Sequence, residues 1–209
     1  MANKFQEIAF TDAVKEAQEH YGSRRHYAKF EGGSDRNDRI GDAEADFIEA
    51  RDGFYLATVG EGGQPYVQFR GGNRGFLKVI DEHTLGWADF RGNLQYVSVG
   101  NASANSKAAI FLMDYANRRR LKMLGELEFI DAGDRPDLID KLLDPTYEAK
   151  VERAAVFNVK AFDWNCPQHI NPRYTMDEIR IMVQPLYEHI ESLERELAIS
   201  REDVDKEIS

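Results

Sequence analysis

The feature that most constrains the fold is a series of short segments, between residues 54 and 162, that are rich in aromatic and β-branched residues. Segments of this kind, bounded by Gly, Pro, Asn or Asp, are typical of β-strands. FYLATV (54–59) and PYVQFR (65–70) flank the turn sequence EGGQ, which predicts a hairpin. The remaining candidate strands are 76–80, 84–90, 108–115, 121–130 and 154–162. Gly125 within the sixth segment predicts a bulge or a close approach of two backbones.

Helical patterns surround these strands. Thr11 is a suitable cap for a helix that runs to Tyr21, and Asp42 for a second short helix. Two more helices are expected over 93–104, broken near Gly100, and over 134–143. At the C-terminal end, Thr175 and Glu178 form a capping-box pattern. Apolar residues follow it at helical spacing: Ile179, Met182, Val183, Leu186, Ile190, Leu193 and Leu197.

The pattern predicts one structural domain of mainly β (α+β) class, built on a six-stranded antiparallel barrel with flanking helices. Residues 1–53 form a helical extension packed on the barrel, residues 54–174 the barrel, and residues 175–209 a C-terminal helix. That helix is amphipathic and can either cap the barrel or join a partner subunit, and we expect it to cap the barrel.

Composition limits the partners. The 209 residues carry a formal net charge of −10, so long-range attraction to nucleic acid or to anionic lipid is not expected. No run of residues is apolar and long enough to span a membrane, and the first residues do not resemble a secretory signal. Cys166 is the single cysteine, which fits a reducing compartment, and we expect a cytoplasmic protein.

A strand, turn and helix over residues 86–99 form a candidate anion site. The strand LGWADF leads to Arg91, Gly92 and Asn93, and Asn93 is the expected cap of the next helix. Backbone amides at a helix start, beside an arginine, can bind an anion. The alternative interpretation is an ordinary capped helix with an arginine in solvent.

A second group of cations lies near the sequence GGNRG. Alternation along residues 65–70 puts Gln68 and Arg70 on one face, and Arg74 and Lys78 follow. These residues either bind a ligand at the end of the barrel or simply decorate an edge strand. The run of three arginines at 118–120 is typical of a solvated turn, although it can also contact a phosphate or a partner subunit.

The segment WNCPQHINPRY (164–174) has an unusual composition for a surface loop. Cys166 and His169 have the spacing of half a zinc site, but no second pair exists, so we expect no metal. A nucleophilic Cys166 assisted by His169 is one alternative. The interpretation we favour is a rigid loop that offers an aromatic wall and hydrogen-bond donors to a ligand.

Taken together, four stretches resemble the pyridoxamine 5′-phosphate oxidase-like FMN-binding split-barrel family, over roughly residues 50–175. They are FYLATVGEGGQPYVQFRGG, GFLKVIDEHTLGWADFRGNLQYVS, AAIFLMDYANRRRLKMLGELE and AFDWNCPQHINPRY. The resemblance implies a split barrel, FMN as cofactor, and a homodimer with FMN at its interface. Pairing would also bury the apolar surface of FLMDY and LKMLG.

The resemblance also implies roles for individual residues. Those on the flavin side are Gln68, Lys78, Ala88 and Asp89. The phosphate-binding turn matches Asn93, Leu94 and Gln95, the partner contact matches Arg120, and Trp164 and Arg173 lie near the ring. Because Leu94 and Gln95 replace basic residues of the vitamin-B6 oxidases, we expect at least two of Arg70, Lys78, Arg91 or the helix-start amides to hold the phosphate. His169 and Asn171 are expected on the substrate side of the ring. They replace that family's Arg-x-His, so pyridoxamine phosphate oxidation is not expected.

The sequence therefore supports two functions of different classes. The first is an FMN-dependent oxidoreductase that moves two electrons between a small substrate or reduced cofactor and the flavin. The second is a flavin-binding carrier or redox sensor without turnover. A haem-handling relative on the same barrel, with His169 as axial ligand, is a third and weaker alternative.

Overall fold

The computed structural model describes residues 3–30, 37–164 and 167–208, and it divides into two compact units. The first unit comprises Met1–Asp114 and Arg118–His169, and it contains the whole β-sheet. The second comprises Tyr115–Asn117 and Ile170–Ser209, and it contains the long C-terminal helix. The predicted Cys166 lies outside the described residues.

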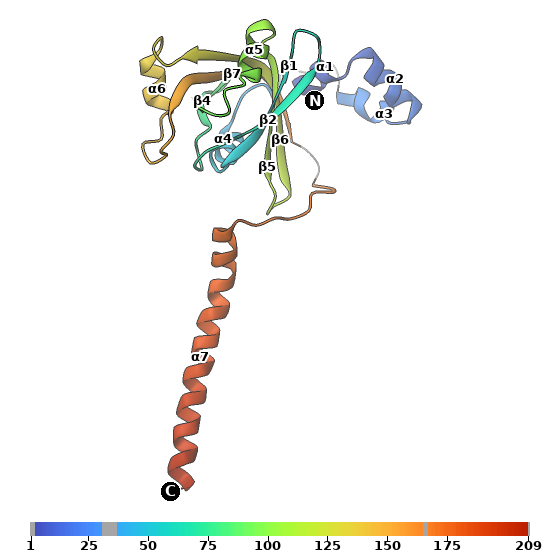
Figure 1. Cartoon of the computed structure of the whole chain (residues 1–209). Helices are drawn as coiled ribbons and strands as arrows, with labels where there is room; N and C mark the ends of the chain where they lie inside the picture. The colour runs from blue at the N-terminus through green and yellow to red at the C-terminus, as the bar shows by residue number, and fades with distance from the viewer. Residues whose placement is uncertain (1–2, 31–36, 165–166, 209) are drawn as a thin grey trace. The chain divides into compact units, whose positions relative to one another are not determined.

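The first unit is built on a curved antiparallel sheet (Figure 1). Its strands are β1 (Gly53–Val59), β2 (Pro65–Gly71), β3 (Lys78–Asp81), β4 (Thr84–Phe90), β5 (Lys107–Asp114), β6 (Arg119–Asp131) and β7 (Val151–Trp164). They lie in the order β2-β1-β5-β6-β7-β4-β3, so β2 and β3, which are consecutive in the chain, form the two ends of the sheet. The mainly β, α+β prediction is confirmed.

The predicted number of strands is wrong, because the sheet has seven strands and not six. The short β3, which overlaps the candidate segment 76–80, pairs with β4 from Lys78 opposite Gly86 to Asp81 opposite Thr84, so each of the seven candidate segments contributes a strand to one sheet. Within the described residues no backbone pairing joins β2 to β3, so the sheet is open between these two strands.

The bulge predicted at Gly125 is confirmed. The register between β6 and β7 shifts between Leu124 and Gly125. A Cβ atom at Gly125 would overlap the backbone oxygen of Asn158 and the ring of Phe157, so only glycine lets the two backbones approach this closely. The bulge bends the two longest strands of the sheet, which helps it to curl around its core.

Eight helical segments accompany the sheet in the described residues. They are α1 (Lys4–Ala9), α2 (Asp12–His20), α3 (Arg24–Tyr27), the 3₁₀ turn η1 (Ala28–Phe30), α4 (Asp42–Glu49), α5 (Val97–Ala104), α6 (Pro136–Leu142) and α7 (Met176–Ile208). Thr11 caps α2 as predicted, since its hydroxyl accepts from the Val14 amide at 3.4 Å. The cap of α4 is Gly41 and not Asp42.

The start of α5 also differs from the prediction. Asn93 does not cap it; its side-chain oxygen accepts from the Gln95 amide at 3.1 Å and closes a local turn. Leu94 (φ 62°) and Tyr96 (φ 51°) then adopt left-handed backbone conformations, so the helix cannot begin before Val97. Gly100 does not break the helix, which continues to Ala104.

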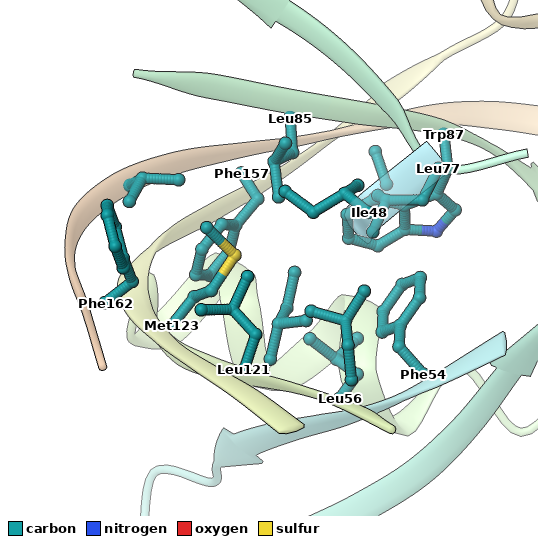
Figure 2. Packing of buried hydrophobic residues seen from close by; sticks show 14 of the residues in the cluster. Ile48, Phe54, Leu56, Leu77, Leu85, Trp87, Leu121, Met123, Phe157 and Phe162 are labelled. Atoms are coloured by element: carbon teal, nitrogen blue, oxygen red, sulfur yellow. The ribbon is translucent and has the colours of Figure 1, made fainter. Parts of the chain in front are cut away.

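The core lies inside the curl of the sheet (Figure 2). Phe54 and Leu56 of β1, Leu121 and Met123 of β6, and Leu85 and Trp87 of β4 point into this common interior. Phe47 and Ile48 of α4 are buried in the same cluster. A smaller cluster under α6 includes Ala88 and Leu142. None of the described helices combines the length and the apolarity that crossing a membrane requires.

Candidate functional site: an anion pocket at the open side of the barrel

The site begins with the alternation of side chains along β2. Gln68 and Arg70 are half-buried and lie opposite Leu56 and Phe54 of β1, whose side chains are in the core. The side chain between them, Phe69, is exposed on the other face. The prediction that Gln68 and Arg70 share a face is thereby confirmed. Because β2 ends the sheet, side chains on its inner face reach the open side of the barrel.

Asp89 at the end of β4 bridges this opening. Its side chain is 1% exposed, and its Oδ1 accepts from Arg70 Nη1 at 2.7 Å. Its Oδ2 accepts from Arg153 Nε at 2.9 Å and from Arg153 Nη2 at 2.8 Å. One carboxylate therefore fixes two guanidinium groups and links β2 to the paired strands β4 and β7, with which β2 makes no backbone pairing.

Arg153 is charged at every physiological pH. Burial opposes its charge, but hydrogen bonds and Coulomb attraction from Asp89, with a further contribution from Glu152, outweigh that effect and raise the pKa of Arg153 above its ordinary value. A raised pKa on a basic group adds stability that is complete below the ordinary pKa and is lost only above it. The contribution of the Arg153 charge to stability therefore does not change around neutral pH.

A small pocket lies beside these arginines, with a volume of about 40 Å³. That is room for roughly three waters. Its lining residues are Tyr66, Gln68, Arg70, Asp89, Phe90, Gly92, Asn93, Leu94, Gln95, Tyr96, Val97, Ser98, Val99 and Arg153. The pocket thus combines the inner face of β2, the end of β4, the turn after it and the first turn of α5.

Donors converge on this pocket. Arg70 Nε is buried and has no hydrogen-bond partner. The Tyr96 side chain makes no capping hydrogen bond to the first turn of α5, so these backbone amides have no capping acceptor from that residue. Ser98 donates to Gln68 Oε1 at 3.1 Å, which leaves the Gln68 amide group as a donor. Such a set matches a ligand that is purely an acceptor, as a phosphate is.

The charges at the pocket are close to balanced. Arg70 and Arg153 face the carboxylates of Asp89 and Glu152, and Glu152 contacts Arg153 at 3.1 Å. Arg91, which does not line the pocket, contacts Glu152 at 3.6 Å and adds one positive charge beside it. The pocket therefore lacks the negative charge that predominates in a chain whose formal net charge is −10.

α5 is held firmly over the pocket. Asn101 Nδ2 donates to Thr58 Oγ1 of β1 at 3.0 Å, and Thr58 is buried. The Ser98–Gln68 hydrogen bond ties the first turn of the helix to β2. The guanidinium of Arg153 stacks on the ring of Tyr96 at 4.9 Å, which supports the left-handed residue before the helix.

Several predicted residues lie away from this pocket. Lys78 begins β3 and contributes to the lowered pKa of Asp144, for which hydrogen bonds from Thr146 and Asn73 are the larger causes. Ala88 faces the small cluster under α6. Arg91 is half-exposed and contacts Glu152. Among the predicted residues, Gln68, Arg70, Asp89, Asn93 and Gln95 are brought together at the pocket.

Trp164 belongs to a different cluster. Its indole nitrogen donates to Glu44 Oε1 of α4 at 2.8 Å, and its ring packs edge-on against Phe47. The guanidinium of Arg119 lies 4.7 Å from the Trp164 ring. These contacts fasten the end of β7 to α4.

None of the remaining predicted residues lines the pocket. His169 is exposed, with a left-handed backbone at φ 63°. Asn171 and Arg173 belong to the second unit, where Arg173 lies over the ring of Tyr115 at 5.0 Å. Arg120 lies on the outer face of β6, and its Nε is buried without a hydrogen-bond partner. Among the described residues no group of three or more His, Cys, Asp or Glu could hold a metal.

Sequence reasoning missed Arg153, the second guanidinium at the pocket. The available signal was an arginine just before the last predicted strand, opposite in charge to Asp89. Only the β4–β7 register, which sets Asp89 directly across from Arg153, brings the two together.

The outer face of the sheet carries an apolar groove of about 380 Å³. Its lining residues are Phe5, Tyr55, Ala57, Val67, Ala109, Ile110, Phe111, Lys122, Met123 and Leu124. Val67 and Phe69 on this face are 60% and 59% exposed. We name this surface, over β2, β1, β5 and β6, the outer apolar face.

No family model matches the chain, and the search of curated proteins finds no match. Solved structures do match it. HupZ of Group A Streptococcus is 15% identical, with 65% of this chain and 99% of that chain covered and a TM-score of 0.47. An FMN-binding protein from Syntrophomonas wolfei is 18% identical, with 71% and 97% covered and a TM-score of 0.45.

An F420 reductase is 22% identical, with 59% of this chain and 98% of that chain covered and a TM-score of 0.42. A protein of the pyridoxinephosphate oxidase family from Clostridium acetobutylicum is 17% identical, with 64% of this chain and 92% of that chain covered and a TM-score of 0.36. At identities of 15–22% and TM-scores of 0.36–0.47, the likeness does not extend to function.

Proposed function

We propose that the chain is a flavoprotein whose pocket beside Arg70 and Arg153 binds the phosphate of FMN. The observation that carries the proposal is Arg70 Nε, a buried cationic donor without a partner that lies at a pocket lined by the first turn of α5. Leaving such a donor unsatisfied costs free energy, and a phosphate oxygen would satisfy it.

The size of the pocket decides which part of the cofactor it takes. Sites that enclose a whole drug-sized ligand measure about 300–1,000 Å³. A pocket of about 40 Å³ suits the phosphate alone. The isoalloxazine ring therefore lies outside it, and a second copy of the chain supplies the remaining wall.

The second copy docks through the outer apolar face. Tyr55, Val67 and Phe69 are large exposed side chains on that face, and pairing buries them. Arg120 borders the same face, and its buried Nε lacks a partner within the single chain. In the dimer, Arg120 reaches the cofactor held by the other copy. The proposed protein is thus a homodimer with FMN at its interface.

Each of these residues has a proposed role in binding the cofactor or in its chemistry. Arg70, Arg153, Gln68 and the α5 amides bind and orient the phosphate, and Asp89 holds the two arginines in place. When bound, FMN supplies two-electron redox chemistry. We infer an oxidoreductase that acts on a small substrate or a reduced cofactor. A cation such as Arg120 beside the ring would stabilise negative charge on the reduced flavin.

The decisive binding experiment compares FMN with riboflavin, which has the same ring but no phosphate. A charge-assisted hydrogen bond contributes about 1.5–3 kcal/mol, so FMN should bind about 10- to 150-fold more tightly than riboflavin. Arg70→Gln should remove most of that preference and leave riboflavin binding nearly unchanged. Calorimetry or flavin fluorescence quenching measures both constants.

Arg74→Gln is the matched control. It removes an exposed arginine from the loop before β3 that does not line the pocket, so the preference for FMN should persist. Thermal unfolding without ligand checks that Arg70→Gln remains folded, because Arg70 also contacts Asp89. Equal affinity for FMN and riboflavin, or no affinity for either, would refute the proposal.

Turnover separates the enzyme from the second candidate, a flavin carrier or redox sensor. Steady-state oxidation of NADH, NADPH or reduced deazaflavin by the FMN-loaded protein supports the oxidoreductase. Stoichiometric FMN binding without turnover on any of these donors supports the carrier or sensor.

A further inference from the structure

Helix α7 has no packing partner in its own unit for a long row of apolar side chains. It runs 33 residues from Met176 to Ile208, which corresponds to a length of about 50 Å. Leu186 is 61% exposed, Ile190 48%, Leu193 49% and Leu197 53%. A long helix in water usually owes its stability to burial of one face against another element.

The row has a seven-residue period. Six apolar residues follow one another at alternating intervals of four and three: Ile179, Val183, Leu186, Ile190, Leu193 and Leu197. This is the a/d spacing of a heptad, with Val183, Ile190 and Leu197 at a, and Ile179, Leu186 and Leu193 at d. A strict a/d row is typical of a coiled coil, whereas a helix that covers a globular core has a broader apolar stripe.

The flanking positions keep the row narrow in its second half. Glu194 stands at e, and His189 and Glu196 stand at g. Polar residues at these positions leave only a and d for apolar contact over residues 189–197. The pattern therefore favours a helical partner over the surface of a barrel.

The residue types specify the kind of partner. A β-branched residue at a combined with leucine at d favours two parallel strands, and Val183, Leu186, Ile190 and Leu193 follow that rule. In a parallel pair, a g residue faces the e residue five positions later on the other helix. His189 then faces Glu194, an imidazole opposite a carboxylate, and Met182 faces Tyr187, two apolar side chains.

The proline inside α7 is compatible with this pairing. Pro185 occupies position c, away from the seam between a and d. A proline removes one backbone hydrogen bond and bends a helix away from its own side. Because Pro185 lies on the side of the helix away from the seam, the helix bends toward the seam.

We propose that α7 forms a parallel two-stranded coiled coil with α7 of a second copy of this chain. The contact is independent of the proposed flavin site and replaces the expectation that the helix caps its own barrel. It gives the chain an interaction surface whose register is set by Val183, Leu186, Ile190 and Leu193.

Cysteine cross-linking of the full-length chain tests the proposal. Leu186→Cys and Leu193→Cys are made separately in a Cys166→Ser background, so that each protein has one thiol. In a parallel pair both d positions meet their own copies at about the 6 Å Cα separation that a disulfide requires. Under mild oxidation, both variants should give several-fold more disulfide-linked dimer than Ile181→Cys, a control at position f that is 75% exposed.

Cross-linking no stronger than in the Ile181→Cys control, at both positions, would overturn the coiled coil. Cross-linking at only one of the two positions would also overturn it, because a parallel pair in register brings both d residues beside their own copies. Far-UV circular dichroism checks that all three variants retain their helix. FMN binding is measured on the same proteins, so failure of the coiled coil is distinguishable from failure of the flavin proposal.

Discussion

At the scale of single residues, Gly125 fixes how closely β6 approaches β7. A side chain there would overlap the Asn158 backbone oxygen and the Phe157 ring, and Phe157 is fully buried. Relief would require a shift of backbone or of a core aromatic ring. Among the described glycines of the sheet, Gly125 is the one at which an added Cβ would come within 3 Å of a backbone atom.

Gly125→Ala should destabilise the protein by about 2 kcal/mol or more, because it overpacks a region without free space. For a chain of this size that lowers the melting temperature by roughly 4–8 °C. Gly100→Ala is the control: it lies inside α5 with open space around it, and it should be neutral or stabilising by up to about 1 kcal/mol. Differential scanning calorimetry measures both, and equal melting temperatures would contradict the prediction.

At the scale of elements, Glu44 joins α4 to β7. Its Oε2 accepts from the Gly41 amide at 3.1 Å, which caps the helix, and its Oε1 accepts from Trp164 at 2.8 Å. The same carboxylate therefore both starts the helix and docks it. Phe47 and Ile48 enter the core from this helix, so its position matters for the whole barrel.

Glu44→Ala should cost about 2 kcal/mol, since a helix cap and the acceptor of a half-buried indole are both lost. Glu49→Ala, an exposed residue of the same helix, should change stability by less than about 0.5 kcal/mol. Urea unfolding followed by tryptophan fluorescence measures the difference. Similar unfolding midpoints for the two variants would show that Glu44 does not hold the helix in place.

The elements themselves were largely predictable, because alternation and capping are local signals. All seven strand segments and the Thr11 and Thr175 caps follow from neighbouring residues. The start of α5 could not be predicted in this way, because Leu94 and Tyr96 adopt left-handed backbone conformations that are unusual for their residue types.

In the candidate site, too, local patterns revealed some residues, whereas others depend on long-range contacts. Gln68 and Arg70 were found by alternation within one strand. Arg153 was missed because it meets Asp89 only through the pairing of β4 with β7, which lies more than 60 positions away along the chain. Trp164 was expected near a ligand from its unusual loop, but the contact with Glu44 is a long-range packing contact that no local pattern reveals.

At the scale of the whole molecule, the two proposals assign self-association to two separate surfaces. One is the outer apolar face of the sheet, and the other is the heptad seam of α7. Because they lie in different units, each can be removed without altering the other.

Val67→Glu, which puts a charge on the outer apolar face, should leave a dimer held by α7. Leu186→Asp should leave a dimer held by the barrel. The double variant should sediment as a monomer at micromolar concentration, because both apolar contacts then carry unpaired charges. The control pair is Tyr21→Glu with Ile181→Asp, which alters exposed residues elsewhere and should stay dimeric. A double variant that remains dimeric would contradict this account.

The position of β2 at one end of the sheet affects how readily its backbone amides exchange with solvent. Among the described strands β2 is bonded only to β1, whereas β6 is bonded along both of its sides. Terminal strands fray more readily than central ones. A ligand bound by Arg70 would therefore slow hydrogen exchange mainly in β2 and at the start of α5. The centre of β6 would exchange at the same slow rate with or without the ligand.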